Sequence, residues 1–172
     1  PLQEDALSAS GTVVTDQFDF RHFDDEKYQS STPDDPQAMI ATILEYVQLE
    51  DHQRALHLVE EVRDLYQKAN HHKGQGDLYY IMGTIYERRG ELDRAINYLA
   101  QSSELFKREQ HESELGYSLK KLGDIHAKMN QHDLALQYYH EALLALRDQQ
   151  DATIGHLHLE IGKAYKTLGK LD

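Results

Sequence analysis

The sequence predicts an all-α protein, a solenoid of three helix pairs followed by one extra helix. Three observations lead to this fold class. Four segments of the chain repeat at an interval of ~40 residues. Within each segment, small and apolar residues recur three and four positions apart, which is the spacing of one helix face. Gly, Asn or charged residues interrupt the pattern at matching places, where helices are expected to end.

The four segments begin at Pro36, Gly76, Gly116 and Gly155, so their starts lie 40, 40 and 39 residues apart. They divide the array into repeats near 36–75, 76–115 and 116–154 and a partial repeat at 155–172. We expect helices near 35–49, 52–70, 75–89, 92–110, 112–129, 132–150 and 152–169. The breaks after the first helices fall at Glu50-Asp51, Gly90-Glu91, Asn130-Gln131 and Gly169-Lys170, and a Gly or Asn at such a break suits a turn through positive φ.

Each complete repeat carries an alanine on its second helix. It follows by twelve positions the residue of the first helix that is Ile43, Gly83 or Gly123. In the second repeat these two positions are Gly83 and Ala95. Tyr86 follows the glycine by three positions and Leu99 follows the alanine by four, so each pair lies on one helix face. Glycine and alanine let the two helices approach closely. The third repeat has the same pattern with Gly123, His126, Ala135 and Tyr139.

The pattern Met82-Gly83-x-x-Tyr86 followed by Ala95-x-x-x-Leu99 resembles the signature of the tetratricopeptide repeat family. The resemblance covers 36–172 and implies a right-handed solenoid that binds other proteins and whose first helices line the concave face. The period exceeds the usual one of about 34 residues, and Ile43 stands where glycine is usual. Such long repeats resemble those of kinesin light chains, spindle-orientation scaffolds and bacterial Rap-type pheromone sensors.

The resemblance implies a set of partner-binding residues on the first helices. The surface formed by these residues is apolar at the N-terminal end of the array and basic at the C-terminal end. Such a surface suits a protein or peptide with apolar and acidic residues. The Lys and Asn pair of a chaperone-type carboxylate clamp is missing, as are the paired asparagines of Rap-type receptors. The partner-binding set is Ile40, Leu44, Val47, Tyr80, Thr84, Arg88, Tyr117, Lys120, Asp124, Lys128, Leu159, Lys163 and Lys166.

Composition argues for a binding module and against several other classes of protein. The formal net charge is −12, and the chain has no cysteine. Such acidity disfavours general binding to nucleic acid, and no apolar run is long enough for a membrane span. We find no nucleophile motif or phosphate-binding loop, and the eleven histidines show no ligand spacing for a metal. We therefore expect a non-enzymatic, cytoplasmic scaffold without metal or cofactor.

A sensory-regulatory array that receives a small peptide, as part of a larger signalling protein, is the alternative function. The chain begins at Pro1 and so looks like a fragment or a processed form. The last helix lacks a second helix of its own, and its apolar stripe is expected to be partly bare. We therefore expect the natural protein to continue past Asp172 or another chain to cover this face. The stripe consists of Ile154, Leu157, Ile161, Tyr165 and Leu168.

Residues 1–32 form a separate acidic N-terminal segment without a helical period, and the array occupies 33–172. Residues 1–35 alone hold nine acids and two bases. Three of the four phenylalanines of the chain lie within 14–28, interleaved with acids. We therefore hypothesise that 14–28 docks on the concave face of its own or a neighbouring chain, as an autoinhibitory plug or a ligand mimic. The alternative is a disordered acidic tail.

Overall fold

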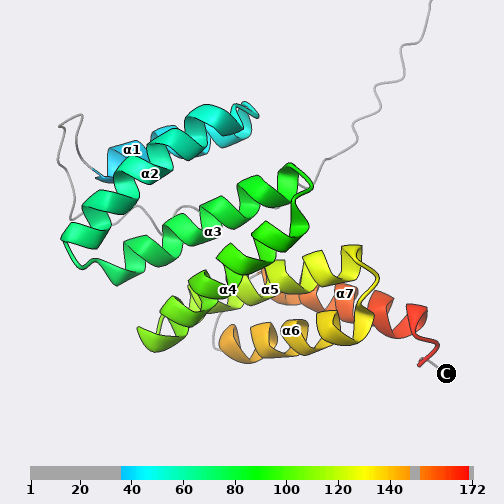
Figure 1. Cartoon of the computed structure of the whole chain (residues 1–172). Helices are drawn as coiled ribbons and strands as arrows, with labels where there is room; N and C mark the ends of the chain where they lie inside the picture. Colours follow the sequence, from blue (N-terminus) through cyan, green and yellow to red (C-terminus); the bar gives the residue numbers. More distant parts are fainter. Residues whose placement is uncertain (1–35, 148–151, 171–172) are drawn as a thin grey trace, which may run out of the picture.

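The computed structural model describes residues 36–147 and 152–170, and it confirms the predicted all-α solenoid. The pairs α1–α2, α3–α4 and α5–α6 follow one another in chain order, and α7 packs against α6 (Figure 1). The predicted segment 1–32 and its docking residues 14–28 lie outside the described residues. The helices of the described part are α1 (Pro36–Gln48), α2 (His52–Lys68), α3 (His72–Arg88), α4 (Leu92–Arg108), α5 (Glu112–Lys128), α6 (His132–Ala145) and α7 (Ala152–Thr167).

The starts of the helices recur at half the predicted repeat length. From α2 onward the helices begin at residues 52, 72, 92, 112, 132 and 152. Apart from α6, the described helices end in one hydrogen-bond pattern. At the end of α2, the N–H of His71 donates to the carbonyl of Tyr66 at 2.9 Å and that of Asn70 to the carbonyl of Gln67 at 3.1 Å. This pattern turns the chain through a left-handed residue and satisfies the last carbonyls of the helix.

The predicted turns of the first helices are confirmed. Glu50, Gly90, Asn130 and Gly169 all have positive φ, between 58° and 76°. Asn70 and Gln110 end the second helices in the same way, although they lie outside the predicted breaks. The same C-terminal turn therefore ends the first helices and the second helices α2 and α4, whereas Leu146 at the end of α6 has a φ of −93°.

Two helix ends differ from the sequence prediction. Helix α3 begins at His72, one turn before the predicted 75. His71 caps it, because its Nδ1 accepts from the N–H of Gly74 at 2.9 Å, and imidazole is not among the usual capping groups. Helix α6 ends at Ala145, earlier than the predicted 150.

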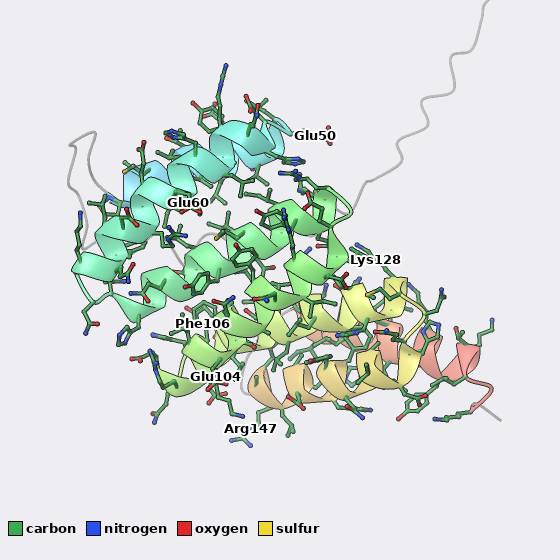
Figure 2. The ribbon with its side chains drawn as sticks, viewed as in Figure 1. Glu50, Glu60, Glu104, Phe106, Lys128 and Arg147 are labelled. Carbon is green, nitrogen blue, oxygen red and sulfur yellow. The ribbon has the colours of Figure 1, made fainter. Side chains whose placement is uncertain are left out.

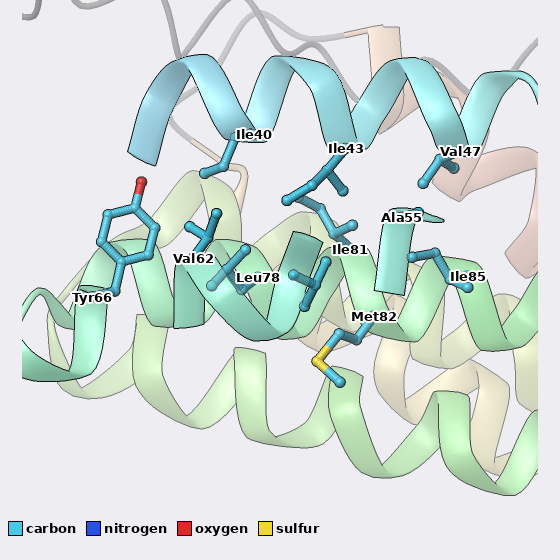
Figure 3. Packing of buried hydrophobic residues seen from close by; sticks show 11 residues of the cluster. Ile40, Ile43, Val47, Ala55, Val62, Tyr66, Leu78, Ile81, Met82 and Ile85 are labelled. Atoms are coloured by element: carbon cyan, nitrogen blue, oxygen red, sulfur yellow. The ribbon is translucent and has the colours of Figure 1, made fainter. Parts of the chain in front are cut away.

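The core lies between successive helices and forms three contiguous apolar clusters. In the first, Ile40, Ile43 and Val47 of α1 pack on α2 and α3 (Figure 3). Ile43 is 0% exposed, so the side chain at the place where glycine is usual fills the core between these helices. Each fully buried side chain of this size stabilises the fold by roughly 1.5–3 kcal/mol.

The predicted close crossings are present in the second and third repeats. A Cβ atom on Gly83 would lie 2.6 Å from Cγ of Leu99 and 3.3 Å from the carbonyl oxygen of Ala95. One on Gly123 would lie 2.5 Å from Cε1 of Tyr139. Only glycine therefore fits at these two positions without movement of its neighbours.

Helix α7 differs from the other first helices, because a Cβ on Gly155 or Gly162 would meet no atom of the described residues within 4 Å. The expectation of a bare stripe on α7 holds only in part. Leu157 and Ile161 are buried in a cluster that also contains side chains of α5 and α6. The clearly exposed leucine of α7 is Leu159, which is 56% exposed.

Candidate binding surface

A buried carboxylate joins the first helices of the second and third repeats. Glu87 of α3 accepts a hydrogen bond from Nζ of Lys121 at 3.0 Å and another from Lys128, both on α5. The Glu87 side chain is 7% exposed, whereas that of Lys128, which is labelled in Figure 2, is 57% exposed. Burial raises the pKa of Glu87, but the two lysines outweigh burial and hold the pKa below its ordinary value of 4.5. The network therefore keeps the carboxylate charged and ties the two repeats together.

A second polar chain runs from α5 to α6. Nζ of Lys120 donates to Asp124 one turn later at 2.9 Å, and the hydroxyl of Tyr139 donates to the same carboxylate at 2.9 Å. Lys120 is 6% exposed. A buried ammonium needs such a partner, because an unpaired charge in the interior is costly. Lys120 and Asp124 therefore help hold α5 and α6 together.

The apolar end of the predicted set lies mostly inside the protein. Ile40 and Val47 are 2% and 6% exposed and belong to the core, so they offer almost no open surface. Leu44 is half-buried against the same cluster. Arg88 reaches back to this region, because its Nη1 donates to the carbonyl of Val47 at 3.1 Å and so satisfies a carbonyl in the last turn of α1.

The middle of the predicted set is also largely enclosed. Tyr80 and Tyr117 are 5% and 7% exposed. The hydroxyl of Thr84, which is half-buried, donates to the carbonyl of Tyr80 at 3.1 Å within the same helix. The structure therefore brings these residues together on adjoining first helices, with little of their surface open to solvent.

The basic end of the set is the exposed part. Leu159 is 56% exposed, and the side chain of Lys163 is 60% exposed and pairs with Glu160 at 2.7 Å. Lys166 is exposed in the last turn of α7. These three positions are four and three residues apart, so they follow one face of α7. They form an open surface of two cations beside one apolar side chain, whereas Lys128 is exposed on α5, where it pairs with Glu87 of α3.

The predicted set omits Asp77, the residue of α3 one turn before Tyr80. Its position in the repeat is that of Tyr117 in the next repeat, 40 residues later. Asp77 is 5% exposed, and its Oδ1 has no hydrogen-bond partner among the described residues. Burial raises the pKa of Asp77 to about 7, Lys73 lowers it and Glu114 raises it. The repeat register placed this acid on the predicted face, but nothing in the sequence signalled its burial.

Two properties of the described residues bear on other classes of function. Over residues 36–147 and 152–170, no group of three or more His, Asp or Glu side chains is arranged to hold a metal ion. The helices of that same part include none with the length and apolar character needed to cross a membrane.

Comparison with known proteins agrees with the repeat. A model of the tetratricopeptide repeat matches residues 46–108 and 74–148. Comparison with curated proteins found no match. The fold is similar to the crystal structure of BtubC (BKLC) from P. vanneervenii, with a TM-score of 0.70 and 15% identity.

That similarity covers 84% of this chain and 61% of the other, so this chain spans less than two thirds of that protein. At such low identity the likeness shows the fold alone. The family match rests on the residues themselves, over more than half of the sequence and across the helix pairs described above. The chain belongs to the tetratricopeptide repeat family, whose repeats generally mediate contacts between proteins.

Proposed function

We propose that the chain binds a protein or peptide segment along the face made by its first helices, and that this segment carries acidic and apolar residues. First helices line the concave side of arrays in this family. The observation that carries the proposal is the exposed face of α7, where Lys163 and Lys166 accompany Leu159, together with exposed Lys128 on α5. Such a surface complements acids that flank an apolar side chain.

Ion pairs and apolar contacts have different roles in this proposed binding. Ion pairs at exposed lysines contribute about 0.2–1 kcal/mol each and weaken with salt. They orient an acidic segment and speed its association more than they hold it. Most of the affinity therefore comes from apolar contact around Leu159 and at half-buried Leu44. Lys120 takes no direct part, because it is enclosed and paired with Asp124.

The experiment selects peptides from a displayed random library against the full chain and measures their affinity for two charge-reversed variants. Lys163→Glu with Lys166→Glu changes the proposed surface. Lys68→Glu with Lys107→Glu makes the same charge change in the last turns of α2 and α4, on second helices. We expect acid-containing peptides to bind the first variant about tenfold or more weakly, because two ion pairs become repulsions. An equal loss in both variants, or no selected acidic peptide, would reject the proposal.

A further inference from the structure

The first helix pair carries an open groove between α1 and α2, at the end of the array opposite α7 (Figure 1). Met39 and Tyr46 of α1 lie on one side of this groove. Arg54, Leu58 and Glu61 of α2 lie on the other side, at spacings of four and three residues that keep them on one helix face. The groove therefore combines half-buried apolar side chains with exposed charges of both signs.

The same face is a packing surface in the second repeat. The groove residues Met39, Tyr46 and Leu58 correspond to Tyr79, Tyr86 and Tyr98, forty residues later. These tyrosines pack against an apolar cluster that is built mainly by side chains of α1 and α2. Positions that line the groove in the first repeat are thus packed against a preceding helix pair in the second. By its place in the repeat, the groove is a surface suited to receive another helix.

The charges of the groove are complementary to each other across a two-fold axis. The side chains of Arg54 and Glu61 are 71% and 53% exposed, and they lie about two turns apart on α2 with Leu58 between them. The guanidinium carbon of Arg54 stands 5.8 Å from the ring centroid of Tyr46, which holds this cation at the groove. If two copies of α2 pair antiparallel, the cation of each faces the acid of the other. A parallel pair would instead set like charges against each other.

We propose that a second copy of the chain occupies this groove, in a two-fold dimer in which α2 of each copy lies antiparallel against α2 of the other. Arg54 of each copy then pairs with Glu61 of the other, and Leu58 lies close to the two-fold axis. Within one chain, Arg54 pairs with Asp51 at 3.3 Å and Glu61 with His57 at 3.4 Å. Exposed pairs of this kind are weak, so exchanging them for pairs between copies costs little.

The size of the contact predicts a weak and reversible dimer. Helix α2 has 17 residues, so it is about 25 Å long, and two helices side by side are about 20 Å wide. The contact then covers roughly 500 Å² per copy, less than the ~800 Å² per partner of a standard interface. We therefore expect a dissociation constant in the micromolar range and a two-fold contact that closes without forming a filament.

The dimer contact is separate from the proposed partner-binding surface. The groove belongs to α1 and α2, whereas the exposed lysines of the proposed function lie on α5 and α7. A dimer leaves those lysines open, so either proposal can fail while the other stands.

Sedimentation equilibrium of the full chain at low salt, from roughly 1 to 500 µM, measures the association. We expect Arg54→Glu and Glu61→Arg each to weaken it about tenfold or more, because both pairs between the copies become repulsions. An equimolar mixture of these two variants should recover the dimer, because each acid then faces a cation again. Recovery needs no further substitution, so it separates pairing from any effect on folding.

Arg94→Glu is the matched control. Arg94 holds the repeat position of Arg54, is 63% exposed, pairs with Glu91 at 2.8 Å and stands 5.4 Å over the ring of Tyr86. Its reversal should leave the association unchanged. A chain that stays monomeric throughout, or equal weakening by Arg94→Glu, would overturn the proposal. A mixture that does not recover would overturn the two-fold pairing and leave the groove to another partner.

Cross-linking gives a second readout of the axis. The chain has no cysteine, so one introduced thiol is unique. Two copies of Leu58→Cys should be joined by a short bifunctional maleimide, and adding Arg54→Glu should reduce the yield about tenfold. Ala100→Cys, at an exposed position of α4, is the control. Equal yields from the two cysteine variants would contradict the position of Leu58 at the two-fold axis.

Discussion

At the scale of single residues, the tight points of the array are the glycines of its first helices. The nearest side-chain atom to an added Cβ is 2.6 Å away at Gly83, in Leu99, and 2.5 Å away at Gly123, in Tyr139. Gly162 holds the same place in α7, but no atom of the part that the structure describes lies within 4 Å of such a Cβ. The same repeat position is therefore tightly packed at Gly83 and Gly123 but has free space around it at Gly162. The chain thus supplies its own control for the effect of packing.

We expect Gly83→Ala and Gly123→Ala to destabilise the chain by roughly 1–3 kcal/mol each, because the new methyl group overpacks the crossing. Gly162→Ala should instead stabilise it by about 0.5–1 kcal/mol, since alanine is the better helix former and has room there. Denaturant unfolding of the three variants measures both effects. Similar changes of one sign at all three positions would show that packing is not what distinguishes them.

At the scale of elements, every described helix end except that of α6 uses a left-handed residue, and the sequence fills that position unevenly. Gly90 has φ of 76° with no atom of the described ranges within 4 Å of an added Cβ, whereas Gln110 has φ of 61° in the same kind of turn. A side chain in this conformation costs about 1–2 kcal/mol, and glycine avoids the cost. The turns at Glu50 and Gln110 therefore carry strain that the turn at Gly90 does not.

Exchanging these residues should change stability in opposite directions. Gly90→Ala should destabilise the chain by about 1 kcal/mol through backbone strain alone, because the site is open. Gln110→Gly should stabilise it by a similar or smaller amount. Thermal unfolding of both variants tests this, and a gain from Gly90→Ala would contradict the assigned turn geometry.

At the scale of the whole molecule, stability is a sum of contacts between neighbouring helix pairs. Glu87 contributes one of these contacts, because it joins α3 to two lysines of α5. Those lysines hold its pKa below the ordinary value in spite of burial. A carboxylate with a lowered pKa stabilises the fold above its unfolded pKa, and this stability is lost as pH falls through the folded pKa.

We therefore expect Glu87→Gln to destabilise the chain at pH 7 by about 1–3 kcal/mol, the usual cost of leaving a buried partner group unsatisfied. The difference from the unsubstituted chain should shrink as pH falls through the lowered pKa of folded Glu87, below which Glu87 is protonated in both states. Glu109→Gln serves as the control, since that acid also has a lowered pKa but lies exposed beside Arg108 and His72. A pH-independent effect of Glu87→Gln would exclude the charge as its cause.

The sequence by itself determined the repeat, the helix pairs and the close crossings. These features depend on the spacing of residue types along the chain, and that spacing is the same in every repeat. Gly83 with Ala95 and the breaks at Gly90 and Asn130 are visible without coordinates. The start of α3 was predicted at the wrong residue, because its cap is the imidazole of His71, which is not a usual capping group.

Only the tertiary structure decided which residues of the first helices are exposed to solvent. Ile40 and Val47 share the repeat positions of exposed Leu159 and Lys166, yet they lie in the core. Lys120 and Asp77 are enclosed as well. The physical reason is that exposure depends on how neighbouring helix pairs pack, and that packing is set by contacts between repeats. A residue's place within one repeat fixes its helix face, but not what the next repeat brings against that face.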